Sequence, residues 1–414
     1  MKINSLERIL LFFIPVILCL ITFSQIRGVG FAYVDDEWML LENALVPKGF
    51  NKNIFLDINN LQYSPLNTLY YILIYKIDNF NPYWYHLGSL IIHLLNGYLV
   101  FKLLETLFSY TSIIDSAIAA YFVMLIWLVH PFNVESVVWI SASKIPLYTF
   151  FFLLSFYTFI IAYKKKQMFS WYYVISVFCY IFSFLFKEQS IILLAVLTLY
   201  IVIDNKLRLV SFSYAQLKCL FPYFILTIIF TFITLYALHY QGASHPFEKF
   251  SVDKRIFFTF YSIGFYLFNT ILPINLHYHY PYPIKSSENI PVIFIVITLL
   301  LIYCLISIIL ILKKKANYNI YLFFFLFFLL NLSLCLHILP LPRASIVADR
   351  YMYIPILGVL SIMTIYFSDW LKINIENNSK RHIIFVTVLS VIVVGFTIYS
   401  NVLVSDWFLR ELNN

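Results

Sequence analysis

Long apolar runs, each close to the length of a membrane-crossing helix, constrain this chain more than any other feature. Residues 9–26, 216–238, 291–312 and 351–370 are almost continuously apolar, and an α-helix needs about 20 such residues to cross hydrocarbon. Membrane β-strands would instead show shorter segments of alternating polarity. Because a continuous run satisfies its backbone hydrogen bonds in lipid only as a helix, the sequence predicts an all-α integral membrane protein with many spans.

The scarcity of charge supports the same fold class. Only 12% of the 414 residues are charged and 62% are hydrophobic, whereas roughly a quarter of a soluble domain is charged. These values exclude a water-soluble fold. The net charge of +8 comes from short Lys and Arg clusters between apolar runs, which is typical of cytoplasmic flanks, so we expect membrane lipid and no nucleic acid as a partner.

The basic clusters set the predicted topology. With a cytoplasmic amino terminus, the clusters at 164–166, 206–218, 313–315 and 380–381 all lie inside, as the positive-inside rule requires. The carboxyl terminus then lies outside, in either the plasma membrane or the endoplasmic reticulum. The span-length rule places about eleven spans at residues 9–26, 84–107, 114–130, 145–163, 170–187, 189–204, 216–239, 290–312, 319–339, 351–370 and 382–404.

Two further apolar stretches, 63–77 and 255–272, are not counted as spans. Either one would move a lysine triplet to the outer side, so we expect them to be helices lying in the outer interface. They fall in the two largest outer loops, 27–83 and 240–289. Because no repeat or soluble linker interrupts the chain, residues 1–414 are expected to form one membrane domain.

Acidic residues gather at the predicted outer ends of the spans. They are Asp35, Asp36, Glu37, Glu42, Glu135, Glu188 and Asp349. Carboxylates beside hydrocarbon are costly and usually functional or paired. We expect a catalytic role for Asp35 and Asp36, between Tyr33 and Trp38, and ordinary solvation for Glu42. Because adjacent carboxylates repel, one has its pKa raised and acts as a base, or both hold a divalent cation.

Cations stand beside two of the other acidic residues. Lys187 precedes Glu188, and Arg350 follows Asp349. A cation at the outer end of a span either neutralises its neighbour or binds a phosphate at headgroup depth, and the sequence leaves both open.

Histidines mark two other points on the predicted outer side. His130 and Pro131 end the third span, because proline cannot continue the helix. His277 and His279 lie in a Tyr- and Pro-rich loop without an evident third ligand, so no metal site is predicted there.

A series of short motifs resembles a known family. In chain order they are Phe31-Ala32-Tyr33-Val34-Asp35-Asp36-Glu37, Tyr63-Ser64-Pro65-Leu66-Asn67, Asn81-Pro82, Tyr85-His86-Leu87, His93-Leu94-Leu95-Asn96, His130-Pro131 with Glu135, Val138-Trp139-Ile140-Ser141, Lys187-Glu188, Tyr266 with Pro273-x-Asn275-Leu276, and Asp349-Arg350-Tyr351-x-Tyr353-x-Pro355. This order is similar to that of the transmembrane O-mannosyltransferases that carry tetratricopeptide repeats, and it covers nearly the whole chain.

The resemblance implies a fold and an activity. The family looks like a branch of the C-type glycosyltransferases, which transfer a sugar from a polyprenyl or dolichyl phosphate outside the cytoplasm. Here it implies transfer of mannose or a similar hexose to a hydroxyl, with protein Ser or Thr as the expected acceptor. Asp35 or Asp36 would be the catalytic carboxylate. The residues expected to bind substrate are His130, Glu135, Lys187, Glu188, Asp349 and Arg350.

Three departures from the family pattern limit the comparison. Ser64 stands where the family usually has Arg, Asp349 where it often has Glu, and no repeats follow the last predicted span. The first departure affects the expected phosphate contacts, and the last removes the expected acceptor-docking module. The substrate of the family is therefore not assigned to this chain together with the fold.

Two other functions stay open at this stage. A transporter or flippase would show charges near the bilayer midplane and Gly/Pro-broken spans in matching halves, whereas the polar residues here gather on one face. A ligase or polymerase of surface glycans would use the same donor with a glycan acceptor, and no residue separates it from a protein-modifying enzyme.

Overall fold

The computed structural model describes residues 5–32, 35–111, 116–166, 170–208, 213–240, 250–339, 343, 345–371 and 379–411. Tyr33 and Val34 of the predicted acidic motif lie outside these residues, as do the first residues of the predicted span 114–130 and residues 241–249 of the second large loop. The described part is all-helical, and its only β-type pairing is an isolated bridge between Asn59 and Gln62.

The helices follow one another along the chain with short connections. The α-helices are α1 Ser5–Thr22, α2 Leu45–Lys48, α3 Pro65–Asp78, α4 Pro82–Phe108, α5 Ser116–Val129, α6 Phe132–Val138, α7 Lys144–Lys164, α8 Trp171–Phe186, α9 Leu193–Arg208, α10 Tyr214–Tyr240, α11 Val252–Ile271, α12 Val292–Lys313, α13 Tyr318–Ser333, α14 Ile356–Trp370 and α15 Ser379–Glu411. Short single-turn helices lie between them at η1 Ser24–Gly28, η2 Glu37–Leu41, η3 Lys52–Phe55, η4 Ile140–Ser143, η5 Glu188–Ile192 and η6 Asp349–Met352.

Several of these helices are long and apolar enough to cross a membrane. In the described residues there are six, or seven if α5 and α6, which meet at a bend of 61°, form one broken span. The six are Pro82–Phe108, Ile140–Lys164, Glu188–Leu207, Gln216–His239, Val292–Lys313 and Lys380–Trp407. These helices fit an integral membrane protein.

The other predicted spans coincide with shorter helices. Helices α8, α13 and α14 each have 10–17 residues, which is less than the length that a full crossing needs, while α1 covers the 18 residues Ser5–Thr22. The count of eleven spans therefore stays a prediction. The two predicted interfacial stretches are also helical, as α3 and α11, and neither is among the six long apolar helices.

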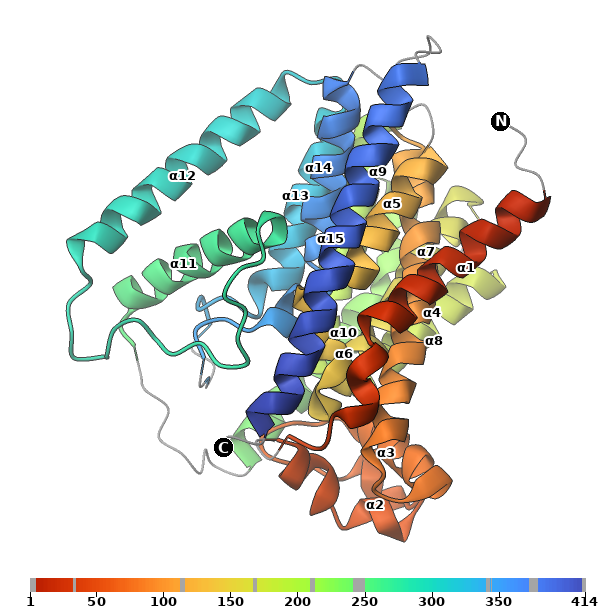
Figure 1. Cartoon of the computed structure of the whole chain (residues 1–414), viewed down its shortest axis with the longest axis vertical. Helices are drawn as coiled ribbons and strands as arrows, with labels where there is room; N and C mark the ends of the chain where they lie inside the picture. Colours follow the sequence, from red (N-terminus) through yellow and green to blue (C-terminus); the bar gives the residue numbers. More distant parts are fainter. Residues whose placement is uncertain are drawn as a thin grey trace.

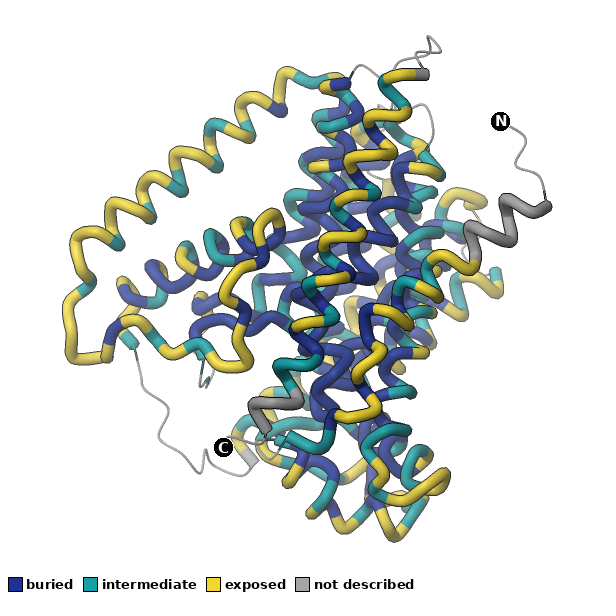
Figure 2. Tube along the Cα trace, viewed as in Figure 1, coloured by how far each residue is buried: buried dark blue, intermediate teal, exposed yellow. Residues whose placement is uncertain are grey.

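The helices form a central bundle with two outliers. Figure 1 shows α4, α5, α7, α9 and α13–α15 running along the long axis, while α11 and α12 stand away from them. Half or more of the apolar window is buried in α4, α7 and α9, and 28% in α15. In contrast, α12 is exposed along its length (Figure 2), and only 6% of its apolar window is buried. Such a uniformly apolar and uncovered helix is typical of lipid contact.

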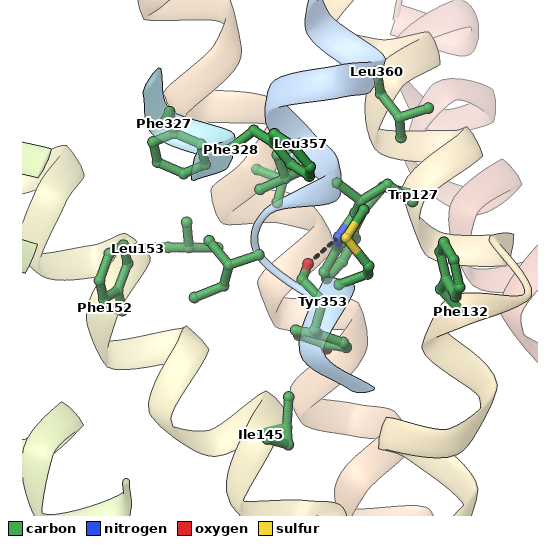
Figure 3. Close-up of a cluster of buried hydrophobic side chains, with 14 of the residues drawn as sticks. Trp127, Phe132, Ile145, Phe152, Leu153, Phe327, Phe328, Tyr353, Leu357 and Leu360 are labelled. Carbon is green, nitrogen blue, oxygen red and sulfur yellow. Dashed lines mark hydrogen bonds between the residues drawn. The ribbon is translucent and has the colours of Figure 1, made fainter. Parts of the chain in front are cut away.

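The bundle is held together by a large apolar core. Figure 3 shows buried side chains of α6, α7, α13 and α14 gathered near Trp127 of α5, whose Nε1 donates to the Tyr353 carbonyl oxygen at 2.8 Å. The backbones of α13 and α14 approach very closely at Gly358, where a Cβ atom would lie 2.4 Å from the Phe324 carbonyl oxygen. A residue without a side chain is therefore required there, as at many close helix crossings in membranes.

A buried polar network ties the same core to two loops. His93 of α4 donates from Nε2 to the Leu128 carbonyl at 2.9 Å and accepts at Nδ1 from the Tyr353 hydroxyl at 2.6 Å. Asn96, one turn further along α4, donates to the Pro146 carbonyl at 2.8 Å. Because buried polar groups are costly unless paired, these bonds fix the starts of α7 and α14 against α4.

Candidate active site

A cavity of about 450 Å³ lies where the predicted acidic motif meets the starts or ends of several helices. Its wall comes from the loop before α3, from η4 and the start of α7, from η5, from the end of α10, and from the segments that follow α13. The charged residues that line it are Asp35, Lys144, Lys187, Glu188, Arg343 and Arg350. Four residues of the sequence-based site are thus brought together, and two further cations join them.

The two adjacent aspartates have different environments. Asp35 is half-buried, lines the cavity and accepts from Trp38 Nε1 at 3.0 Å. Asp36 is 1% exposed and does not line the cavity. Its carboxylate accepts from the Ala32 amide at 2.8 Å and from the Ser141 amide at 2.7 Å, and also from the Ser141 hydroxyl. Asp35 therefore faces the cavity, while Asp36 joins the acidic loop to η4.

Burial changes the acidity of the inner aspartate. It raises the pKa of Asp36 from 3.8 to about 6, because desolvation outweighs the hydrogen bonds from Ser141 and Ala32. The neighbouring charge of Asp35 adds a small further increase. The expected raised pKa thus falls on the aspartate that is shielded from the cavity.

Arg350 is held by a carboxylate from a distant part of the chain. Its amide nitrogen donates to Glu135 Oε2 at 2.7 Å, and its guanidinium donates to Glu135 Oε1. The guanidinium also lies 4.9 Å from the ring centre of Trp139 and 5.2 Å from that of Tyr351. Burial lowers the pKa of Arg350, but the nearby Glu135 carboxylate outweighs burial and raises it above its ordinary value. The side chain is therefore a fixed positive charge at the cavity wall.

Two lysines supply further positive charge. Lys187 is 8% exposed and lies 3.5 Å from the Glu188 carboxylate, so the neighbouring pair expected from the sequence does form. Lys144, at the first position of α7, is 9% exposed and donates to the Gln62 amide oxygen. Gln62 belongs to a tight turn in which Asn60 and Leu61 have φ values of 44° and 64°. This turn brings its residues onto the cavity wall.

Three residues expected to bind substrate lie behind the cavity wall. Glu135 is 2% exposed and reaches the cavity only through Arg350. Asp349 is 5% exposed and accepts from the Tyr280 hydroxyl at 2.7 Å. His130 is fully buried, with Nε2 3.2 Å from the Thr270 carbonyl. None of the three lines the cavity, and Glu135 holds one residue of its wall, Arg350, in place.

Part of the cavity wall is apolar. Leu235 and Leu238 near the end of α10 face the cavity together with Leu334 and Leu339 after α13. Leu235 and Leu339 are also exposed on the outside of the molecule, at 47% each. The cavity thus combines a cationic wall with an apolar wall that continues to the surface.

Sequence reasoning missed Lys144, Arg343, Gln62 and Ser141. Lys144 was detectable, because it is the only charged residue between Glu135 and Lys164 and stands at the start of an apolar run, where charges are usually functional. Gln62 carries no such signal. Arg343 donates to the Leu334 and Cys335 carbonyls, and a Pro-rich sequence context gives no indication of that position.

A metal site is not evident. Within the described ranges, no group of three His, Cys, Asp or Glu side chains is close enough to hold a metal ion. His279, one of the two loop histidines, has Nδ1 2.7 Å from the Ser345 hydroxyl.

Comparison of the chain with protein-family models, with curated proteins and with solved structures finds no match. The function therefore has to be inferred from the cavity itself.

Proposed function

We propose that this protein is a membrane glycosyltransferase. It moves mannose or a similar hexose from a polyprenyl or dolichyl phosphate to an acceptor hydroxyl. The observation that carries the proposal is the cavity, in which two partly exposed carboxylates, Asp35 and Glu188, share a wall with four cations beside apolar side chains. Such a combination suits a substrate with an anionic head, a polar sugar and a hydrocarbon tail.

In the proposed reaction, Asp35 acts as the general base. It takes the proton from the acceptor hydroxyl, and the acceptor oxygen attacks the anomeric carbon while the bond from that carbon to the phosphate oxygen breaks. A single displacement inverts the anomeric carbon. The fixed cations stabilise the charge that develops on the leaving phosphate, which is usually the largest contribution to such catalysis.

The remaining site residues position these groups. Asp36 fixes η4 through Ser141, and Glu135 fixes Arg350. The lipid chain runs along the wall formed by Leu235, Leu238 and Leu334. A protein Ser or Thr, or the hydroxyl of a surface glycan, is the acceptor.

The proposal includes the finer topology predicted from the sequence. It assumes about eleven spans, a C-type fold and a cavity open to the extracytoplasmic side. In support, Lys144 at the first position of α7 lines the cavity, whereas Lys164 ends the same helix and Lys165 and Lys166 follow it. Positive flanks at the far end are expected when the cavity faces outward.

The decisive experiment is a transfer assay with the purified full-length protein in detergent. A panel of polyprenyl-phosphate hexoses is offered with a Ser/Thr-rich peptide and, separately, with a free oligosaccharide, and products are identified by mass. We expect one donor to give product, and Asp35→Asn to lower the rate by at least about 100-fold, the lower range for a lost general base. Lys102→Gln, which removes a partly exposed cation that does not line the cavity, should leave the rate unchanged.

Two results would overturn the proposal. One is the absence of transfer from every donor with either acceptor. The other is movement of intact lipid-linked sugar across proteoliposome membranes without product, which would identify a flippase.

A further inference from the structure

The cations of the cavity differ in whether a carboxylate neutralises them. Arg350 is paired with Glu135, and Lys187 with Glu188. Lys144 has only neutral partners, the Gln62 amide oxygen and, at 3.8 Å, the Met39 sulfur. Arg343 likewise contacts only backbone carbonyl oxygens. Among the described residues, neither Lys144 nor Arg343 forms an ion pair.

An unneutralised ammonium group in this position is costly. Lys144 is 9% exposed; the cations Lys187 and Arg350 oppose its charge, whereas the carboxylates of Glu188 and Asp35 favour it. Burying a charge without an ion-pair partner is costly, so an anion bound beside Lys144 stabilises its protonated form. Because Lys144 and Arg343 both lack an ion-pair partner, the cavity is suited to receive an anion.

The proposed reaction moves negative charge toward these cations. The donor is a phosphodiester with one negative charge, whereas the released lipid phosphate is a monoester with about two, since its second pKa is about 6. The acceptor O–H bond breaks and its proton goes to Asp35. The new bond forms between the acceptor oxygen and the anomeric carbon, and the electron pair of the broken bond stays on the phosphate. One negative charge is thus lost at Asp35 and one is gained by the phosphate.

We propose that Lys144 and Arg343 form a site for the dianionic phosphate monoester, so that the cavity binds the leaving lipid phosphate better than the donor phosphodiester. This inference rests on the proposed function. The charges balance on both sides of the reaction: two cations face ionised Asp35 and a monoanion before transfer, and neutral Asp35 and a dianion after it. Groups that bind the product charge more strongly than the substrate charge also stabilise the transition state between them.

The same balance accounts for product release. When Asp35 returns its proton to water, its charge again faces the cavity, and the bound dianion is then in excess of the cations. Because ionised Asp35 now shares the two cations, the lipid phosphate is held less tightly once the base is regenerated, although the dianion still binds better than a monoanion. Replacing Asp35 by Asn removes this weakening, and the monoester should stay bound more tightly.

The test measures binding, not transfer. The full-length protein in detergent is titrated by calorimetry at pH 7, where a phosphate monoester is mainly a dianion, with octyl phosphate, with methyl octyl phosphate and with inorganic phosphate. We expect octyl phosphate to bind about tenfold more tightly than its methyl ester, the size of one charge-assisted hydrogen bond. Lys144→Gln should bring the two affinities together, Lys144→Arg should keep them apart, and Asp35→Asn should widen the difference. Lys102→Gln is the matched control and should leave the ratio unchanged.

Each outcome decides a defined point. Equal affinity for monoester and diester in the wild-type protein overturns the inference, as does an unchanged ratio in Lys144→Gln. If inorganic phosphate binds as tightly as octyl phosphate, the proposal that the ligand is a lipid phosphate is wrong. Monoester selectivity without sugar transfer would leave this site intact and reject the proposed function, whereas transfer without selectivity would reject this inference alone.

Discussion

Replacing Asp36 by Asn substitutes an NH₂ group for one oxygen of a buried carboxylate and removes the charge of that carboxylate. The carboxylate accepts hydrogen bonds from Ala32 on one oxygen and from Ser141 on the other. An asparagine oxygen can keep the Ser141 bonds, but its NH₂ group then faces the Ala32 N–H. The hydrogen bond from Ala32 is lost, and the Asn NH₂ group and the Ala32 N–H, which are both donors, face each other. Together these effects cost about 1–3 kcal/mol of unfolding free energy.

The pH dependence of this loss has a definite sign. Burial raises the pKa of Asp36 from 3.8 to about 6, so the folded protein keeps a proton that the unfolded chain releases between these values. The stabilisation from Asp36 is therefore complete below a pH of about 4 and is lost as the pH rises through about 6. The two-unit difference corresponds to about 3 kcal/mol. Because Asn does not titrate, the variant should be less stable than the wild type at pH 4.5 and as stable or more stable at pH 8.

Thermal unfolding of both proteins in one detergent from pH 4.5 to 8 measures this difference. Glu42→Gln, at an exposed carboxylate, is the matched control and should shift the stability by less than about 0.5 kcal/mol at every pH. A stability difference that stays constant with pH, or that favours the wild type more as pH rises, would refute a desolvated carboxyl at Asp36.

Three other predictions concern the fold and the topology. Glu135→Gln leaves the partly buried Arg350 charge without its counter-ion and should lower the unfolding free energy by about 1–3 kcal/mol, measured by denaturation in detergent; an unchanged unfolding free energy would contradict the ion pair. Gly358→Leu should destabilise the bundle by at least about 1–3 kcal/mol through overpacking, whereas Gly395→Ala, where nothing lies within 4 Å of the added carbon, should be neutral or stabilising in the same melts. In a cysteine-free background, Glu37→Cys should react with an impermeant thiol reagent from outside the cell and Lys165→Cys only after permeabilisation, and the reverse pattern would invert the predicted topology.

Helix positions could be predicted from the sequence because each apolar run has to satisfy its own backbone. The length of each helix could not be predicted, since the residue at which a helix ends depends on contacts with other parts of the fold. Pro131 predicts the end of α5, but the sequence does not reveal that Phe132–Val138 continues as a helix turned by 61°. Nor does it show that α13 and α14 are shorter than the apolar runs that contain them.

The candidate site was predictable only where its partners are neighbours in sequence. The Lys187–Glu188 pair forms as expected. Arg350, in contrast, pairs with Glu135, which lies 215 residues away, and the adjacent Asp349 instead accepts from Tyr280. Pairing over such distances depends on the fold. Asp35 and Asp36 differ in burial for the same reason, because the packing of η4 against the acidic loop decides which of the two adjacent carboxylates is buried.

The bend between α5 and α6 also restricts how the length of the chain can vary. Glu135 reaches Arg350 because it stands at a fixed rotation on the short helix α6, which begins just after the bend. One residue inserted between Pro131 and Glu135 would turn that carboxylate by about 100° around the helix axis. Homologues should therefore differ at these positions by substitution and not by insertion or deletion, while exposed turns elsewhere accept both.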